Sequence, residues 1–349
     1  GEPIGAAAFA AVAQRVLDDP ATDDWSYFEL LTLMAWHAAA DARCQWQVLE
    51  VGLGGRLDTT NAVAEKAVAV ITPIDLEHTA ILGETIAEIA AEKAGILTGP
   101  CELVIAPQRG SALDVIREAA MAVEATVHEV AEDCALRVIS QSVDQLVFDL
   151  KTPEHTYRQI TLELLGQHQA ENAAAAVRAA ELAVASAGLE ISEPQVRQAL
   201  SAVRLPGRGE VIGRKPLTIV VGAHTPLAAK RLRQALDQSG VPKQRVFILG
   251  LLDGKDVEPI VRALLGPDDQ AFVAPPTSAR AADPGEIAEA VRALGVPVST
   301  VPDVATALER ATVTAGERGA VIATGSLRTV ADAREARLVI TGDRALGLR

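Results

Sequence analysis

Residues 46–60, WQVLEVGLGGRLDTT, decide the fold that the sequence predicts. The large apolar residues Val48, Leu49 and Val51 are followed at once by a glycine-rich run, a pattern typical of a buried strand that enters a loop. Glu50 lies near the carboxyl end of that predicted strand, where ligands bind in an open parallel sheet. A carboxylate is costly to bury without a cation or a donor. We therefore predict that Glu50 is a metal ligand or a general base, with local capping or pairing as the alternative.

The composition indicates a globular protein with two domains. The chain has 349 residues, which is long for one domain, and its hydrophobic content of 49% is sufficient for sizeable cores. Its net charge is −14, whereas binding to nucleic acid or anionic lipid needs a basic surface. We therefore expect no nucleic-acid partner and no membrane partner. Any phosphate-bearing ligand is expected to be held locally, by magnesium or by backbone amides.

The cysteines and the start of the chain bear on its compartment. Three cysteines lie far apart and outside any CxxC motif, so neither a disulfide framework nor a zinc site is indicated. No apolar stretch is long enough to span a bilayer, and the start has no signal-peptide pattern. We expect a cytoplasmic monomer. Because the chain begins with Gly1 rather than Met, we also expect its true amino terminus to lie upstream.

The first half of the chain alternates helical and strand patterns. Helices are predicted over residues 1–20, 25–40 and 112–125, and further buried strands over 68–72 and 102–107. The loop after residue 72 carries three potential metal ligands, Asp75, Glu77 and His78. A lone histidine in a loop is more often an ordinary surface residue, and this alternative stays open.

The helix predicted within ETIAEIAAEKAGIL carries Lys93 on its apolar stripe, which has i, i+3, i+4 spacing. This position predicts a side chain that points inward. An inward lysine either becomes a reactive neutral amine or lays its stem over apolar surface with its head in water. Near Glu50 and His78, such an amine would also be able to take up carbon dioxide and form a carbamate, a metal-binding carboxylate.

The second half begins with alternating polar and apolar residues over 135–165, which predict a small antiparallel patch. A long alanine-rich helix follows, and its first turn carries His168, Gln169 and Asn172. These side chains either face a nucleotide or cap the helix. Residues 205–210, LPGRGE, form the linker candidate, and beyond them strands and helices alternate as in a second doubly wound α/β domain.

Eight ordered blocks resemble the folylpolyglutamate synthases and dihydrofolate synthases, a branch of the Mur ligase superfamily. They run nearly from end to end: YFELLT (27–32), EVGLGGRLDTTN (50–61), HTAILGETIAEIAAEKAGI (78–96), GQHQAENAA (166–174), PGRGE (206–210), GAHTPLA (222–228), GLLDGKD (250–256) and ATGSL (323–327). Eight blocks in order are far more specific than a lone glycine motif.

The resemblance implies an α/β protein with two Mur ligase domains. Residues 1–208 would form the P-loop-type central domain, a parallel sheet with helices and a small antiparallel patch, and residues 209–349 the C-terminal Rossmann-like domain. The implied activity is ATP-dependent amide ligation, with Mg²⁺ as cofactor and ATP as co-substrate. ATP would phosphorylate a carboxylate of dihydropteroate or folate to an acyl phosphate, which the amine of glutamate then attacks.

The same resemblance implies roles for individual residues. The metal ligands are Glu50, His78 and Lys93, with Lys93 carbamylated as in the family. Lys93 and His224 are the catalytic candidates, and Asn172, Arg208 and His224 the nucleotide-binding ones. The substrate-binding candidates are Ser26, Tyr27, Phe28, Glu29, Leu57, Asp58, Thr59 and Ser326.

Two features depart from the family pattern. Val221 stands where the family has an aspartate that contacts the nucleotide, and loss of such a contact costs about 1–3 kcal/mol. No G-x-x-x-x-G-K-[ST] loop occurs in the 349 residues, and the family has that loop upstream of GEPI. We therefore expect a truncated protein whose residues 1–349 alone use ATP very poorly. The alternatives are a folate- or nucleotide-binding relative without turnover, and a sister Mur ligase acting on a cell-wall precursor.

Overall fold

The computed structural model describes residues 3–340, and contacts divide the chain into two compact units, Gly1–Glu129 and Val130–Arg349. The predicted boundary at residue 208 followed a linker pattern rather than contacts, and it stays a prediction. No helix within residues 3–340 is both long enough and apolar enough to cross a bilayer.

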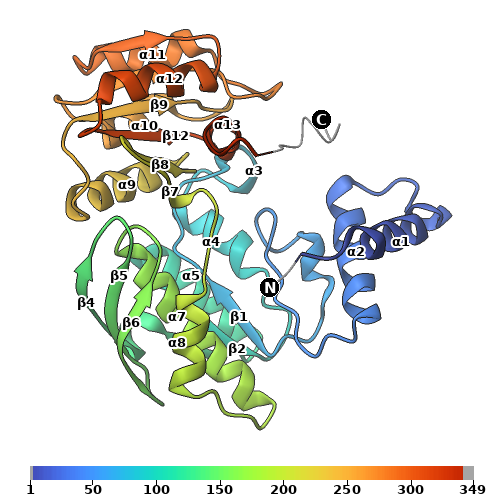
Figure 1. The fold of residues 1–349 in the computed structure, drawn as a ribbon. Helices are drawn as coiled ribbons and strands as arrows, with labels where there is room; N and C mark the ends of the chain where they lie inside the picture. The colour runs from blue at the N-terminus through green and yellow to red at the C-terminus, as the bar shows by residue number, and fades with distance from the viewer. Residues whose placement is uncertain (1–2, 341–349) are drawn as a thin grey trace. The chain divides into compact units, whose positions relative to one another are not determined.

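The first unit is built around a small parallel sheet with strand order β1-β2-β3 (Figure 1). Its elements are α1 (Ala6–Leu17), η1 (Pro20–Thr22), α2 (Tyr27–Asp41), η2 (Thr59–Ala62), β1 (Val68–Ile71), α3 (Thr79–Leu82), α4 (Ile86–Ala94), β2 (Glu102–Ile105), α5 (Gly110–Ala122) and β3 (Thr126–Glu129). Ile89 of α4, Leu103 of β2 and Ile116 of α5 are fully buried in its core. The predicted helices and the strands at 68–72 and 102–107 are confirmed, whereas β3 lacks an apolar run and was missed.

The buried strand predicted for the first motif is wrong. Residues 46–51 form no strand (Figure 1). Val48 is 100% exposed. A strand needs a hydrogen-bonded neighbour. Among the described residues, β1 pairs with β2, and no backbone group pairs with residues 46–51. An apolar run leads to a buried strand only where a neighbouring strand pairs with it, and residues 46–51 have no such neighbour among the described residues.

The second unit begins with an antiparallel sheet, β4-β5-β6, which confirms the predicted patch (Figure 1). Its elements are α6 (Val130–Asp133), β4 (Ala135–Gln141), β5 (Leu146–Lys151), β6 (Thr156–Leu162), α7 (His168–Ser186), α8 (Glu193–Ser201), β7 (Arg208–Arg214), β8 (Leu217–Val221), α9 (Pro226–Gln238), β9 (Arg245–Leu249), α10 (Val257–Leu264), β10 (Gln270–Val273), α11 (Pro284–Ala293), β11 (Val298–Thr300), α12 (Val304–Ala315), β12 (Ala320–Thr324) and α13 (Leu327–Leu338). Helix α8 was missed by sequence reasoning.

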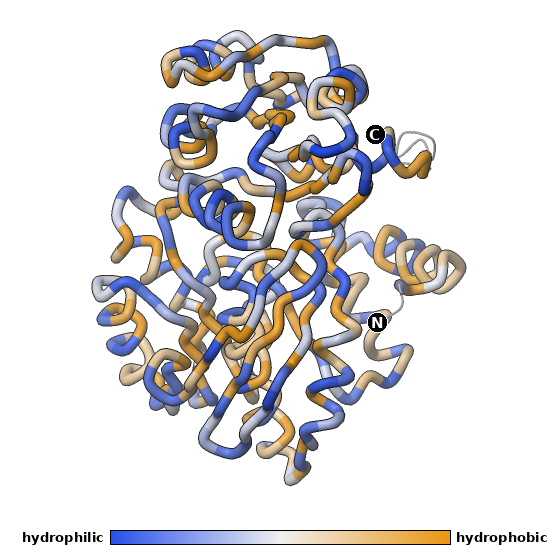
Figure 2. The backbone as a smooth tube through the Cα atoms, turned by 60° about the vertical axis from the view of Figure 1, so that its left-hand side comes forward, coloured by the Kyte–Doolittle hydropathy of each residue, from blue (hydrophilic) through white to orange (hydrophobic). Residues whose placement is uncertain are grey.

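A six-stranded sheet, order β11-β10-β9-β12-β8-β7, forms the rest of this unit. Helices α9, α10 and α11 pack on one face and α12 and α13 on the other, which confirms the doubly wound prediction. Every residue of β9 and β12 is buried, as expected for a sheet covered on both faces. Figure 2 shows hydrophobic stretches of the backbone alternating with hydrophilic ones along the chain. Strand β7 pairs antiparallel with β8, so the predicted linker 205–210 already belongs to the sheet from Arg208 onward.

Three adjacent strands of this sheet, β8, β12 and β9, are each followed directly by a glycine: Gly222, Gly325 and Gly250. The backbone N–H of Gly250 donates to the carbonyl of Thr324 at 3.1 Å. Gly325 has φ 107°, and a Cβ there would lie 2.6 Å from the carbonyl oxygen of Gly250. A side chain at Gly325 would therefore force two backbone segments apart.

Replacing Gly325 by alanine is expected to lower the free energy of unfolding by about 2–3 kcal/mol, from left-handed strain plus overpacking. Gly188 is the matched control, because its φ is 69° and a Cβ there would meet nothing within 4 Å. It follows α7 in the left-handed position of a helix end, where Leu189 N donates to the carbonyl oxygen of Val184. Gly188→Ala should cost only about 1 kcal/mol. Urea unfolding measures both, and equal losses would contradict the clash at Gly325.

Candidate functional site

The amino terminus of α2 holds the first group of predicted substrate-binding residues. Ser26 and Glu29 form a capping box: Ser26 N donates to Glu29 Oε2 at 2.7 Å, and Glu29 N donates to Ser26 Oγ at 3.4 Å. The hydrogen bonds from Ser26 lower the pKa of Glu29. Phe28 packs on the glycine loop, since a Cβ at Gly52 would lie 2.7 Å from its ring. Tyr27 remains 77% exposed and is the side chain of this group most open to a ligand.

Asp58 organises the loop that follows the first motif. Its Oδ2 accepts hydrogen bonds from Gly52 N and Leu53 N, each at 3.0 Å. Its Oδ1 accepts from Thr60 N at 3.0 Å and Thr60 Oγ1 at 2.6 Å. Both carboxylate oxygens thus accept hydrogen bonds from within the loop. The prediction of Asp58 as a substrate-binding residue did not include this role. Neighbouring Leu57 is 80% exposed.

Replacing Asp58 by asparagine should loosen this loop, because one of its two acceptors becomes an N–H₂ donor facing other donors. We expect amide hydrogen exchange at Gly52 and Leu53, or at Thr60, to accelerate about tenfold, the equivalent of roughly 1.4 kcal/mol. Asp41→Asn serves as control, since Asp41 is an exposed carboxylate paired with Arg15 on the helices. Unchanged exchange in the loop would contradict the organising role.

The three predicted metal ligands all lie in the first unit. Glu50 is exposed and makes no hydrogen bond or ion pair with any described residue. His78 is exposed in left-handed backbone (φ 55°), with Nε2 3.5 Å from Glu77 Oε1. Lys93 is half-buried in the last turn of α4, so its predicted inward orientation is observed only in part.

The chemistry of these donors fits a divalent cation such as Mg²⁺ if Lys93 carries a carbamate. Mg²⁺ prefers oxygen ligands, and Glu50 supplies a carboxylate, whereas His78 supplies a softer nitrogen. A carbamate on Lys93 would add a second anionic oxygen ligand. Within residues 3–340, no group of three or more His, Cys, Asp or Glu side chains is arranged to hold a metal. The metal site stays a prediction.

The predicted nucleotide-binding residues all lie in the second unit. Asn172 is exposed near the start of α7, and its Nδ2 donates to Gln169 Oε1 at 3.1 Å. This hydrogen bond is local to the first turn of α7, whose N-cap residue Gln167 makes no side-chain cap hydrogen bond. Arg208 is paired in register with Val221.

The end of β8 brings two of these residues together. A Cβ at Gly222 would lie 3.8 Å from Arg208 Nη1, and His224 Nδ1 lies 3.0 Å from the carbonyl oxygen of Gly222. Ser326, by contrast, is only 3% exposed. Its Oγ accepts from Thr329 N at 3.0 Å and caps α13, so its hydroxyl is used within the fold.

A cavity of about 150 Å³ lies between α7 and α9. Its lining is almost wholly polar and comprises Gln167, His168, Glu171, Arg231, Gln234, Ala235 and Gln238. Arg231 Nη2 lies 4.0 Å from Glu171 Oε2. Burial, followed by the charge of Arg231, lowers the pKa of His168 to about 4. Sequence reasoning missed Arg231, and the i, i+3, i+7 spacing of polar residues 231, 234 and 238 was the available signal.

The depressed pKa of His168 predicts a pH dependence of stability. Its unfolded-state pKa is about 6.5, so between about pH 6 and pH 4 the unfolded chain binds the extra proton. Stability should therefore fall by about 1 kcal/mol per pH unit as the pH is lowered through this window. In urea unfolding, the advantage of wild type over His168→Gln should shrink from pH 7 to pH 4.5. A constant difference would show that His168 titrates normally.

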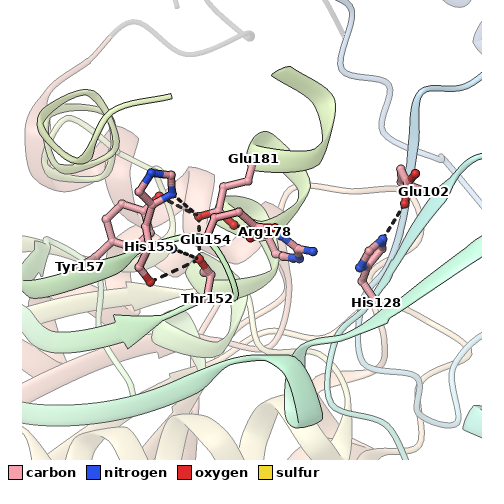
Figure 3. Close-up of polar contacts among 8 residues, drawn as sticks. All are labelled: Glu102, His128, Thr152, Glu154, His155, Tyr157, Arg178 and Glu181. Carbon is pink, nitrogen blue, oxygen red and sulfur yellow. Dashed lines mark hydrogen bonds and ion pairs between the residues drawn. The ribbon is translucent and has the colours of Figure 1, made fainter. Parts of the chain in front are cut away.

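A buried polar network holds the carboxyl-terminal half of α7 against the turn between β5 and β6 (Figure 3). Glu181 Oε1 accepts from Thr152 Oγ1 and from Tyr157 OH, each at 2.8 Å. Arg178 Nη1 lies 3.3 Å from Glu181 Oε2 and also pairs with Glu154. Burial and the hydrogen bond to Glu181 raise the pKa of Tyr157. The network thus fixes the helix that carries Asn172.

Comparisons with known proteins agree with this architecture. The model of the Mur ligase middle domain matches residues 9–180, and that of the Mur ligase glutamate ligase domain matches residues 207–327. The crystal structure of Mycobacterium tuberculosis folylpolyglutamate synthase complexed with ADP and AMPPCP is similar to the structure of this chain. Its TM-score is 0.86 at 32% identity, covering 95% of this chain and 79% of that one.

Curated relatives point to the same family. A dihydrofolate synthase/folylpolyglutamate synthase of M. tuberculosis is 36% identical over 265 residues, covering 74% of this chain and 54% of that protein. The chain therefore spans about half the length of this relative. The Escherichia coli dihydrofolate synthase/folylpolyglutamate synthase is 32% identical over 322 residues, covering 89% of this chain and 69% of that protein. The chain therefore belongs to the dihydrofolate synthase/folylpolyglutamate synthase family of Mur ligases.

Proposed function

We propose that this protein is an ATP-dependent ligase that joins L-glutamate to dihydropteroate, to folate, or to both. The observation that carries the proposal is that two Mur ligase models match in order across the chain, together with the 32% identity to the E. coli relative. The ADP and AMPPCP in the M. tuberculosis neighbour support ATP as the co-substrate. A cytoplasmic location and a monomeric state stay predictions.

The proposed reaction has two steps. The substrate carboxylate attacks the γ-phosphorus of ATP, giving an acyl phosphate and releasing ADP. The amine nitrogen of glutamate then attacks the acyl carbon, so that an amide bond forms, the carbon–oxygen bond to phosphate breaks, and a proton is lost from nitrogen. Phosphoryl transfer depends mainly on positioning and on neutralising charge.

The residues proposed for this chemistry fall into three groups. Glu50, His78 and a carbamylated Lys93 would hold Mg²⁺, which supplies charge neutralisation on the transferred phosphoryl group. Asn172, Arg208 and His224 would orient the nucleotide. The exposed residues Tyr27 (77%) and Leu57 (80%) would pack against the flat aromatic face of the pterin substrate, and Phe28 would support the loop beneath it. Ser26, Glu29, Asp58 and Ser326 are each engaged in hydrogen bonds within the chain, so we propose for them a supporting role at the substrate site.

The experiment measures ATP-dependent incorporation of labelled glutamate by the longest protein that the gene encodes. The substrate panel holds dihydropteroate, a reduced folate and a nucleotide-linked cell-wall precursor. Ligation to the first or second supports the proposal and identifies the substrate, whereas ligation only to the third assigns a sister Mur ligase. Folate binding without any ligation would contradict the proposal and support a folate-binding relative without turnover. The poor ATP use predicted for residues 1–349 alone is tested in the same assay.

A further inference from the structure

A loop and a helix of the first unit meet at unusually close range. A Cβ at Gly55 would lie 2.9 Å from the carbonyl oxygens of both Glu92 and Lys93. A Cβ at Gly95 would clash with Arg56. The loop of residues 52–61 therefore touches the last turn of α4 through backbone, at the turn that carries Lys93 (α4 spans Ile86–Ala94). Only glycine at both positions allows this approach.

Polar groups fasten the same contact. Arg56 N donates to the carbonyl oxygen of Glu92 at 2.9 Å, and the Arg56 guanidinium donates to Glu92 Oε1 through Nε at 3.1 Å and Nη2 at 2.9 Å. Asn61 Nδ2 donates to the carbonyl oxygen of Gly95 at 2.9 Å. These bonds satisfy carbonyl groups at the end of α4 that have no partner within the helix.

Stability alone does not account for these side chains. Arg56 is 55% exposed in its ion pair with Glu92, and exposed pairs contribute only about 0–1 kcal/mol. Asn61 leaves its Oδ1 buried without a hydrogen-bond partner among the described residues. An unsatisfied buried acceptor costs about 1–3 kcal/mol. An apolar side chain at position 61 would avoid that cost. We therefore attribute the presence of the amide to the hydrogen bond that its N–H₂ group donates to the carbonyl oxygen of Gly95.

We propose that Arg56, Glu92 and Asn61 are positioning residues that lock loop 52–61 to the last turn of α4. The lock keeps a fixed separation between the Lys93 side chain and the exposed face of residues 57–59. This inference rests on the proposed function, in which Lys93 serves the phosphoryl group and the loop serves the acid substrate. Lys93 and the loop must then stay at a fixed distance from each other so that the substrate carboxylate reaches ATP, because a small misplacement of reacting groups lowers the rate by a large factor.

The test compares Arg56→Met and Asn61→Ala with wild type, in the full-length protein. Arg117→Met is the matched control, since Arg117 makes a similar two-nitrogen pair with Glu129 and is 47% exposed, away from the loop. Hydrogen exchange by mass spectrometry follows peptides covering residues 52–61 and 93–97. Steady-state kinetics separate kcat from the KM of ATP and of the acid substrate.

We expect both variants to raise exchange about tenfold in both peptides and to lower kcat about tenfold. The KM of ATP should not change, and Arg56→Lys, which keeps one donor to Glu92, should recover part of kcat. Faster exchange in the loop alone, or effects equal to those of Arg117→Met, would overturn the proposal. If wild type itself shows no ligation, the proposed function fails, and the exchange of the two peptides alone decides whether the lock exists.

Discussion

Replacing Glu181 by alanine is expected to lower the free energy of unfolding by about 3–5 kcal/mol. Glu181 is 5% exposed and Arg178 4% exposed, so the substitution leaves a buried guanidinium without its helix partner. It also strands the hydroxyl groups of Thr152 and Tyr157, which both donate to Glu181 Oε1. Urea unfolding at pH 7 measures the loss.

Three further variants make this prediction specific. Tyr157→Phe and Thr152→Val each remove one donor and should cost about 1 kcal/mol. Combining Glu181→Leu with Arg178→Leu removes both charges, so the double variant should be more stable than Glu181→Ala alone. A loss below about 1 kcal/mol for Glu181→Ala would mean that water or Glu154 compensates Arg178 fully.

Replacing Lys93 by methionine is expected to lower kcat/KM for glutamate ligation by about 10²-fold or more, the scale of losing one preorganised charge-stabilising group. Methionine keeps the length and apolar stem of the side chain. The side chain of Lys93 makes no hydrogen bond or ion pair with any described residue, so the free energy of unfolding should stay within about 0.5 kcal/mol of wild type.

Lys93→Arg separates the two roles that a lysine offers here. Arginine retains a cation but cannot form the carbamate, so it should be as defective as methionine if the carbamate is the active form. Retained activity in Lys93→Arg would assign a simple cationic role instead. Stripping carbon dioxide from the buffer should lower the activity of wild type and leave both variants unchanged.

Local signals in the sequence predicted much of the fold. The structure adds two local features that the sequence analysis did not use, the capping boxes Ser26–Glu29 at α2 and Thr85–Glu88 at α4. Alternating apolar strands and amphipathic helices beyond residue 210 sufficed to predict a doubly wound sheet. Each of these features depends on neighbours within one or two turns, so the sequence alone determines it.

Pairing and hydrogen bonding over longer distances did not follow from the sequence. Residues 46–51 carry a strand pattern, yet Val48 is fully exposed because no described strand lies beside it. Arg208 has a linker sequence around it, but its register with Val221 makes it the first residue of a strand. Propensity shows what a segment prefers, whereas a strand exists only where another segment supplies its hydrogen bonds.

The candidate site divides in the same way. The sequence, through its resemblance to the family, predicted which residues carry the chemistry, and these roles stay predictions: Glu50, His78 and Lys93 as metal-site candidates, and Arg208 and His224 on the nucleotide side. Only the tertiary structure decided that both carboxylate oxygens of Asp58 accept hydrogen bonds from its own loop. It also decided that Glu181 accepts hydrogen bonds from Thr152 and Tyr157 of the distant β5–β6 hairpin. The physical reason is that residue type fixes what a side chain is able to bind, whereas folding fixes which partners reach it first.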